Sequence, residues 1–204
     1  MLRKFRHYAK NKDGLAAVEF AFVMPILIMM LLGMVELTQA MLARNDVTNM
    51  ASTAANLIAE EKTVTGADLT NVFNAVNAML FPFNLTGQPD PTKPATSLYS
   101  ITVTSLVANA AGSPIVAWSC SQNGTKETKG NPPSVPLKDN AVIANGTSVI
   151  WARIQYTYIS PLNYFLKAVN PKPWINDFYL KPRRAPAGVP MDPTNPPSAT
   201  VCNM

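Results

Sequence analysis

The chain has 204 residues, of which 48% are hydrophobic and 14% charged, and its formal net charge is +5. This length allows one membrane helix and one domain of ordinary size, and excludes two sizeable domains outside a membrane. Five of the 17 lysines and arginines precede Gly14 together with one of the 12 acidic residues, so the 12 basic and 11 acidic residues after Gly14 leave a net charge of only +1. The basic excess is local and predicts a cytoplasmic leader beside a membrane span, not a nucleic-acid-binding surface.

Residues 1–14 form this basic leader, and residues 15–35 form an apolar run of 21 residues. About 20 apolar residues suffice for an α-helix to cross a membrane, so we expect a transmembrane helix over residues 15–36. Glu19 is the only charged residue of the run. A carboxylate near the bilayer centre costs about 3 kcal/mol, but Glu19 lies only four residues inside the run, about 6 Å deep, and can reach the headgroups.

Two alternatives to a processed anchor follow from the same residues. A secretory signal also begins basic and continues apolar, but its apolar region is usually shorter and ends at a small-residue cleavage site. An uncut signal anchor is the other alternative. Pro25 fits either kind of anchor, because membrane helices tolerate proline with a mild kink.

The leader, the glycine and the acid together resemble a class III, or prepilin-type, signal sequence. In that class the leader is cut after the glycine, and the fifth residue of the mature chain is a glutamate. The matching positions here are Gly14, Leu15 and Glu19, with Phe20 completing the VEF triplet. The wider stretch GLAAVEFAFVMPILIMMLLGMVELTQAMLARNDVTNMASTAANLIA resembles the TadE/TadG family of pilin-like proteins of tight-adherence (Flp) pilus systems. The resemblance implies a prepilin peptidase, other pilin-like subunits and an inner-membrane assembly platform as partners.

A physical reason accompanies the position of Glu19. Cleavage after Gly14 exposes an α-amino group at Leu15, at the end of a helix whose dipole is already positive. The family resemblance implies that the glutamate of one subunit faces the amine of the next. Because a misregistered neighbour leaves both charges unpaired, we interpret the pair as a device that fixes register.

Beyond the membrane span, helical spacing continues. Apolar residues recur in steps of three and four from Glu36 to Lys62, which predicts that the first helix continues outward. Thr65 followed by Asp68 predicts the start of a second helix that ends near Phe81-Pro82. Residues 37–81 are therefore expected to be extracytoplasmic helices, and the proline-rich residues 82–96 a loop.

Alternating patterns then predict strands. Residues 97–108, 115–121 and 147–160 each fit a strand, and the first alternates Tyr99, Ile101 and Val103 with hydroxyl residues, as in a half-buried strand. The polar segment 123–136 predicts a long hairpin connection. We expect residues 97–184 to form an antiparallel sheet packed on the first helix. The segments IQYTYISPL, 154–162, and FYLKPRR, 178–184, resemble two further TadE-like elements, but we assign no binding role to Arg183 or Arg184.

Cys120 and Cys202 are the only cysteines, and they lie in the part of the chain predicted to be outside the cytoplasm. Disulfides persist there, so we expect a bond that ties the proline-rich tail, residues 185–204, back to the strand near Trp118; two free thiols are the alternative. Closing a loop of about 80 residues contributes on the order of 4 kcal/mol.

An enzymatic role is not expected. The single histidine, His7, belongs to the leader, so the processed chain would lack histidine for acid–base chemistry, triads or metal ligands. No glycine-rich phosphate loop and no cysteine pair at zinc spacing is present. We predict no cofactor and no metal.

The predictions combine into one hypothesis. The fold class is α+β and pilin-like: a long amino-terminal helix, a second short helix and a small antiparallel sheet packed on the helix. The protein is expected to be a pseudopilin or minor pilin in the bacterial inner membrane, with its carboxy-terminal domain in the periplasm. Its modest length favours the E-type of the family. The alternative is an uncleaved, signal-anchored extracytoplasmic binding module.

Overall fold

The computed structural model describes residues 14–87, 94–137, 143, 146–160, 173–198 and 200–203. The predicted leader up to residue 13 and parts of the predicted loop, sheet region and tail therefore lie outside the described residues. The chain divides into two compact units, Met1–Met41 and Leu42–Met204.

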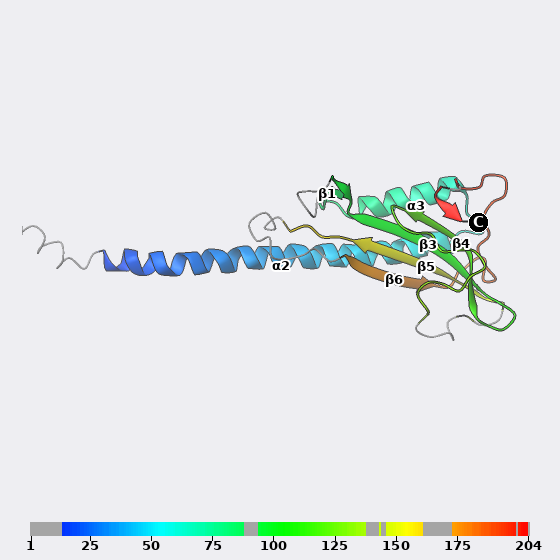
Figure 1. Ribbon diagram of the computed structural model, residues 1–204, viewed down its shortest axis with the longest axis horizontal. Coiled ribbons are helices and arrows are strands. Elements are labelled where there is room, and N and C mark those ends of the chain that lie inside the picture. The colour runs from blue at the N-terminus through cyan, green and yellow to red at the C-terminus, as the bar shows by residue number, and fades with distance from the viewer. Residues whose placement is uncertain are drawn as a thin grey trace, which may run out of the picture. The chain divides into compact units, whose positions relative to one another are not determined.

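The helices and strands are α2 (Leu15–Ala59), α3 (Gly66–Ala78), β1 (Thr86–Gly87), β2 (Thr96–Ser97), β3 (Tyr99–Ala108), β4 (Pro114–Gln122), β5 (Ser148–Tyr156), β6 (Trp174–Leu180) and β7 (Cys202–Asn203) (Figure 1). A long helix, a second short helix and antiparallel sheets confirm the predicted α+β class. Helix α2 ends three residues before the predicted end of its pattern.

Helix α3 begins at the predicted capping box. The hydroxyl of Thr65 accepts the backbone N–H of Asp68 at 3.2 Å, and the Asp68 carboxylate accepts the backbone N–H of Thr65 at 2.9 Å. These bonds satisfy two donors that a helix start leaves without partners. Leu69, Val72 and Val76 follow on the buried face, which packs toward the core.

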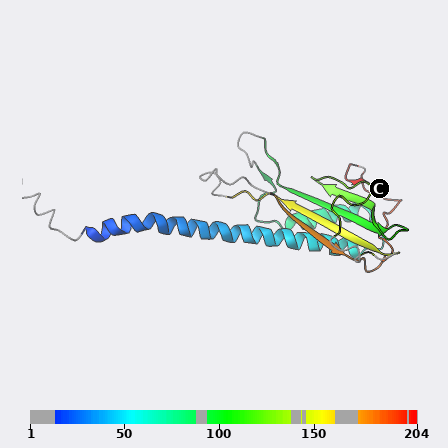
Figure 2. The same cartoon turned by 60° about the horizontal axis from the view of Figure 1, so that its bottom comes forward.

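Five strands form an antiparallel sheet in the order β6-β5-β3-β4-β7, and β1 and β2 form a separate pair. Strand β5, yellow, runs between β3 and β6 (Figure 2). Because β3 lies between β4 and β5, the segment joining those two strands is a crossover, and the predicted hairpin connection is wrong. The reason is that β3 is the central strand: it pairs with both β4 and β5 over nearly its whole length.

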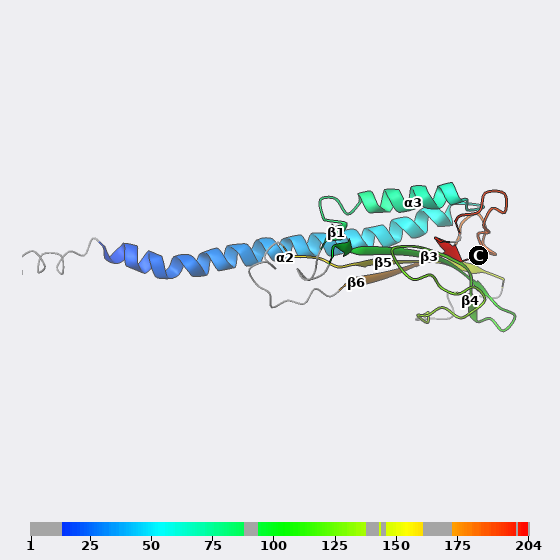
Figure 3. The same cartoon turned by 45° about the horizontal axis from the view of Figure 1, so that its top comes forward.

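The carboxy-terminal part of α2 and helix α3 lie side by side on one face of the five-stranded sheet (Figure 3). Their apolar residues and the inner face of the sheet form one buried cluster that includes Met50, Ile58, Val76, Ile101 and Ile154. Each of these side chains is at most 1% exposed. Burial of this kind contributes about 1.5–3 kcal/mol for each large apolar side chain.

The opposite, outer face of the sheet is also buried over part of β3. Thr102 is 6% exposed and Thr104 is fully buried, so the prediction of a half-buried strand is wrong. The hydroxyl groups pair across to β4: Thr102 with Ser121 at 2.8 Å, and Thr104 with Ser119 at 2.9 Å. Burying a polar group costs little once it is hydrogen-bonded, which explains how a polar face can lie inside the domain.

Candidate functional site

The predicted processing position lies at the start of α2. The helix begins at Leu15, and the carbonyl oxygen of Gly14 accepts the backbone N–H of Val18 at 3.2 Å. A side-chain Cβ added at Gly14 would meet no atom within 4 Å. The described part of the fold therefore provides no packing reason for a glycine at this position.

Glu19 and Phe20 lie in the following turn, and both are exposed. Glu19 forms no hydrogen bond or ion pair with another described residue. Glu19 follows Leu15, the residue at which α2 begins, by about one helical turn. The first turn of α2 itself contains no acidic residue.

In the described part of the first unit, residues 14–41, the large apolar side chains of α2 are exposed on all sides. Phe22, Met29 and Met34 are each more than 70% exposed. Among the described residues one helix, which includes this run, is long and apolar enough to cross a membrane, and its most apolar 18-residue stretch has a mean hydropathy of 2.4. A helix that is hydrophobic all round is stable only in apolar surroundings, either lipid or other helices.

The two cysteines form the expected disulfide. Cys120 lies in β4 and Cys202 in β7, directly opposite each other in the ladder, and both are buried. The tail also contacts the strand near Trp118, whose indole N–H donates to the carbonyl oxygen of Val189 at 2.7 Å. The carbonyl oxygen of Pro186 also accepts the backbone N–H of Ser148 in β5 at 2.9 Å, so the tail is fixed to the sheet at several places.

Arg183, for which the sequence predicted no binding role, connects the end of β6 to the end of α2. Its backbone N–H donates to the carbonyl oxygen of Ala59 at 2.9 Å, and its guanidinium pairs with Glu60 at 3.1 Å. One carbonyl that a helix end leaves without a partner is thus satisfied. The contact with the helix end comes from the backbone, and the guanidinium adds only an exposed ion pair, so Arg183 has a structural contact and no binding role is assigned to it.

Sequence reasoning missed a polar cluster on the outer face of the sheet. The carboxylate of Asp177 accepts hydrogen bonds from Arg153 Nε at 2.7 Å and from Trp151 Nε1 at 2.8 Å. The guanidinium also lies over the Trp151 ring, 4.8 Å from its centre. The hydrogen bond to Asp177 raises the pKa of Arg153, against the opposing effect of burial. The available signal was the alternation that places Trp151 and Arg153 on the same face of β5.

The chain therefore combines an amino-terminal apolar helix of membrane-spanning length with an α+β unit. Residues 14–56 match the family model of TadE-like protein, which confirms the predicted resemblance over this segment. The match contains Gly14, Glu19 and nearly all of α2, whereas α3 and the sheets lie beyond it. No curated protein and no solved structure matches the chain.

Proposed function

We propose that this protein is a pilin-like structural and assembly subunit, a pseudopilin or minor pilin, of a Tad (Flp) pilus. A prepilin peptidase cuts it after Gly14, and α2 then anchors it in the bacterial inner membrane with the α+β unit in the periplasm. The observation that carries the proposal is the coincidence, within the TadE-like segment, of an open Gly14, a helix that starts at Leu15, and Glu19, the only acid of the apolar run, one turn later.

Several features support processing after Gly14. No described neighbour restricts the size of a side chain at this position, so a need for glycine would come from a partner such as a peptidase. The basic leader favours the cytoplasmic side, where a prepilin peptidase acts on this class of signal. Cutting removes the carbonyl that accepts the Val18 N–H and adds a positive amine at Leu15.

After cutting, Glu19 pairs with the new amino terminus of a neighbouring subunit. The new amine and the Glu19 carboxylate are the two charges of the apolar run, residues 15–35, and each is costly when left unpaired in a low-dielectric bundle. A neighbouring subunit in the correct register pairs them. The exposed apolar surface of the helix provides the contact area with other pilin-like subunits and with the assembly platform.

The proposal separates cutting from assembly, and paired variants test this. The chain is co-expressed with a prepilin peptidase and partner subunits, and a photo-crosslinking amino acid replaces Phe22, which is 75% exposed. Glu19→Ala is expected to be cut normally but to lose at least 90% of its crosslinks to partner subunits. Glu36→Ala is the matched control, because it removes an acid at the other end of the apolar run. It is expected to be cut normally and to keep its crosslinks to partner subunits. Full crosslinking by Glu19→Ala contradicts the assembly role.

A further inference from the structure

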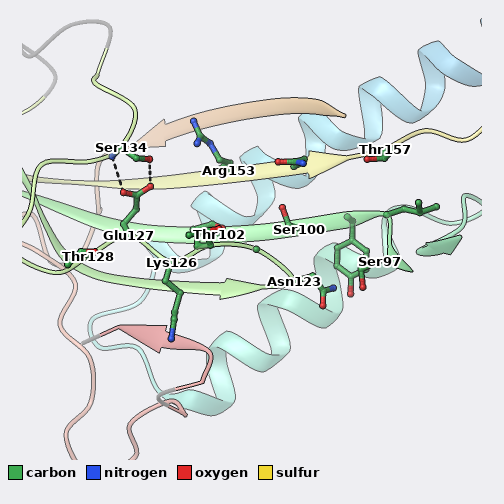
Figure 4. A pocket seen from close by; sticks show the side chains of 15 residues that line it. Ser97, Ser100, Thr102, Asn123, Lys126, Glu127, Thr128, Ser134, Arg153 and Thr157 are labelled. Atoms are coloured by element: carbon green, nitrogen blue, oxygen red, sulfur yellow. Dashed lines mark hydrogen bonds between the residues drawn. The ribbon is translucent and has the colours of Figure 1, made fainter. Parts of the chain in front are cut away.

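A cavity of about 540 Å³ lies over the outer face of the sheet in the second unit. Strands β3 and β5 form its floor, and residues 123–134, here called the arm, form its wall (Figure 4). The volume falls within the range of about 300–1,000 Å³ that is typical of small-molecule sites. The lining is formed mainly by hydroxyl, amide and charged side chains, unlike the apolar pockets that bind most drug-like ligands.

The arm is held in place before any ligand arrives. A Cβ at Gly124 would lie 2.7 Å from the hydroxyl of Ser121 and 3.0 Å from Ser100, so only glycine fits this close approach without a shift. Asn123 precedes it with φ of 58°, a left-handed conformation that asparagine tolerates better than most residues. The backbone N–H of Glu127 also donates to Ser119 at 3.0 Å. The cavity is therefore preorganised.

The charged groups around the cavity are already engaged within the protein. Arg153 is paired with Asp177, and Lys126 donates to the carbonyl oxygens of Thr200 and Cys202. Glu127 accepts hydrogen bonds from the backbone and the hydroxyl of Ser134. Figure 4 shows the Lys126 side chain directed toward the tail and Glu127 directed toward Ser134. The positive charges of Lys126 and Arg153 are balanced by the negative charges of Glu127 and Asp177, so the site has no net charge that would favour a charged ligand, and a neutral ligand fits better.

Polar groups that remain for a ligand lie on the floor and at the rim. Ser100 and Gln155 lie directly opposite each other in the β3–β5 ladder, and Thr157 and Asn123 lie nearby in the lining. Their side chains form no hydrogen bond with another described residue, and each is at least partly exposed. Together they offer hydroxyl and amide groups that both donate and accept.

The floor does not suit an extended peptide. Strand β3 pairs with β4 on one side and with β5 on the other, and β5 pairs also with β6. Peptides that bind to sheets add to a free edge through backbone hydrogen bonds. The two floor strands as described are each paired on both sides, so they offer no free edge, and recognition there depends on the side-chain groups above them. A ligand rich in hydroxyl groups matches that chemistry.

We propose that this cavity binds a short neutral oligosaccharide. Ser100 and Gln155 contact its hydroxyl groups from the floor, while Asn123 and Thr157 contact it from the rim. Binding is weak, with a Kd of about 1 mM, because hydrogen bonds exchanged with water contribute little net free energy. This inference is independent of cutting at Gly14 and of pilus assembly.

The test uses the full chain in phospholipid nanodiscs, since maltoside or glucoside detergents would compete for the site. Calorimetric titration and saturation-transfer NMR compare maltotriose, cellotriose and chitotriose with an acidic trisaccharide, trigalacturonate, and with a serine-rich nonapeptide. At least one neutral trisaccharide is expected to bind with a Kd of about 1 mM. Gln155→Ala is expected to raise that Kd about fivefold, and Ser100→Ala on the facing strand to raise it similarly.

Asn74→Ala, which removes an exposed amide from α3 on the other side of the sheet, is the matched control and should leave the Kd unchanged. Urea midpoints equal to that of the wild type establish that the variants are folded. The proposal is overturned if no neutral trisaccharide binds at about 10 mM, if only the acidic sugar or the peptide binds, or if both Gln155→Ala and Ser100→Ala keep the wild-type Kd.

Discussion

Cys202 lies opposite Cys120 in the ladder between β4 and β7, with the two Cα atoms 4.0 Å apart and the two sulfurs bonded. The bond joins positions 82 residues apart, so it closes a large loop in the unfolded chain. Replacing both cysteines by alanine is expected to lower the free energy of unfolding by about 4 kcal/mol. Urea unfolding followed by tryptophan fluorescence measures the difference.

The same variant tests the position of the tail. The hydrogen bond from Trp118 to Val189 is expected to weaken once β7 is released, and the indole N–H resonance of Trp118 reports on it. Wild-type protein treated with reductant under unfolding conditions and refolded with its thiols blocked serves as the control. An unchanged urea midpoint together with an unchanged Trp118 signal would show that the disulfide does not hold the tail.

Asp177 is the shared acceptor of the outer-face cluster, and this makes its removal more damaging than removal of its partners. Asp177→Ala leaves the indole N–H of Trp151, a residue that is 1% exposed, and a half-buried guanidinium without an acceptor. We expect a loss of about 2–4 kcal/mol for Asp177→Ala and about 1–2 kcal/mol for Arg153→Ala.

Arg183→Ala is the matched control for this series. Its ion pair with Glu60 is exposed on both sides, and its backbone contact with Ala59 survives the substitution. A loss below about 1 kcal/mol is expected. Urea midpoints rank the stability losses of Asp177→Ala, Arg153→Ala and Arg183→Ala. Equal losses in all three variants would contradict the shared-acceptor arrangement.

Thr65 contributes the capping hydroxyl at the start of α3. Thr65→Ala removes the acceptor of the Asp68 N–H and is expected to cost about 1 kcal/mol. Thr70→Ala removes a hydroxyl in the same helix that only bonds back to the Gly66 carbonyl at an exposed position, and should cost less than about 0.5 kcal/mol. Thermal unfolding compares the pair; equal losses would argue against the cap.

Burial of Tyr156 makes the free energy of unfolding depend on pH in alkaline solution. Burial raises its pKa to about 12 from 10.0, because the ionised phenolate is disfavoured inside the domain. The folded chain keeps this proton where the unfolded chain has lost it, so the contribution is complete below about pH 10 and is lost between about pH 10 and pH 12. The total loss is about 2–3 kcal/mol.

Tyr156→Phe isolates this effect. It removes the hydroxyl that donates to the carbonyl oxygen of Asn84 at 3.2 Å, so it is less stable at neutral pH, but its stability should fall less steeply above about pH 10. Urea unfolding at several pH values gives the slope of stability against pH for the wild type and for the variant. A slope equal to that of the wild type would show that Tyr156 does not titrate as its burial requires.

Local signals in the sequence predicted the elements that depend on local rules. The glycine before the apolar run, the Thr65–Asp68 box and the alternation in residues 147–160 each correspond to an element in the structure, the last to β5. Strand β6 was not recognised as a strand of its own, because Asn176 and Asp177 at its centre are poor strand formers and are retained for contacts with Thr48 and Arg153. Strand β7 has only two residues, and its pairing accompanies the disulfide.

Pairing between strands far apart in the sequence could not be predicted either. The sequence gives no measure of which strand is central, and the position of β3 between β4 and β5 is what made the predicted hairpin wrong. The burial of Thr102 and Thr104 follows from hydroxyl pairs with β4 that no single strand pattern reveals. For the same reason the polar cavity under the arm was not foreseen, although Asn123-Gly124 carried a turn signal.

Intact mass is the most direct test of the central claim that the chain is cut after Gly14. The protein is isolated from membranes of cells that express a prepilin peptidase, with Gly14→Leu as the variant that fits the open position without strain. We predict that the wild type has the mass of residues 15–204 and that the variant keeps residues 1–14. A wild-type mass that still includes Met1 would contradict the account and favour the uncleaved anchor.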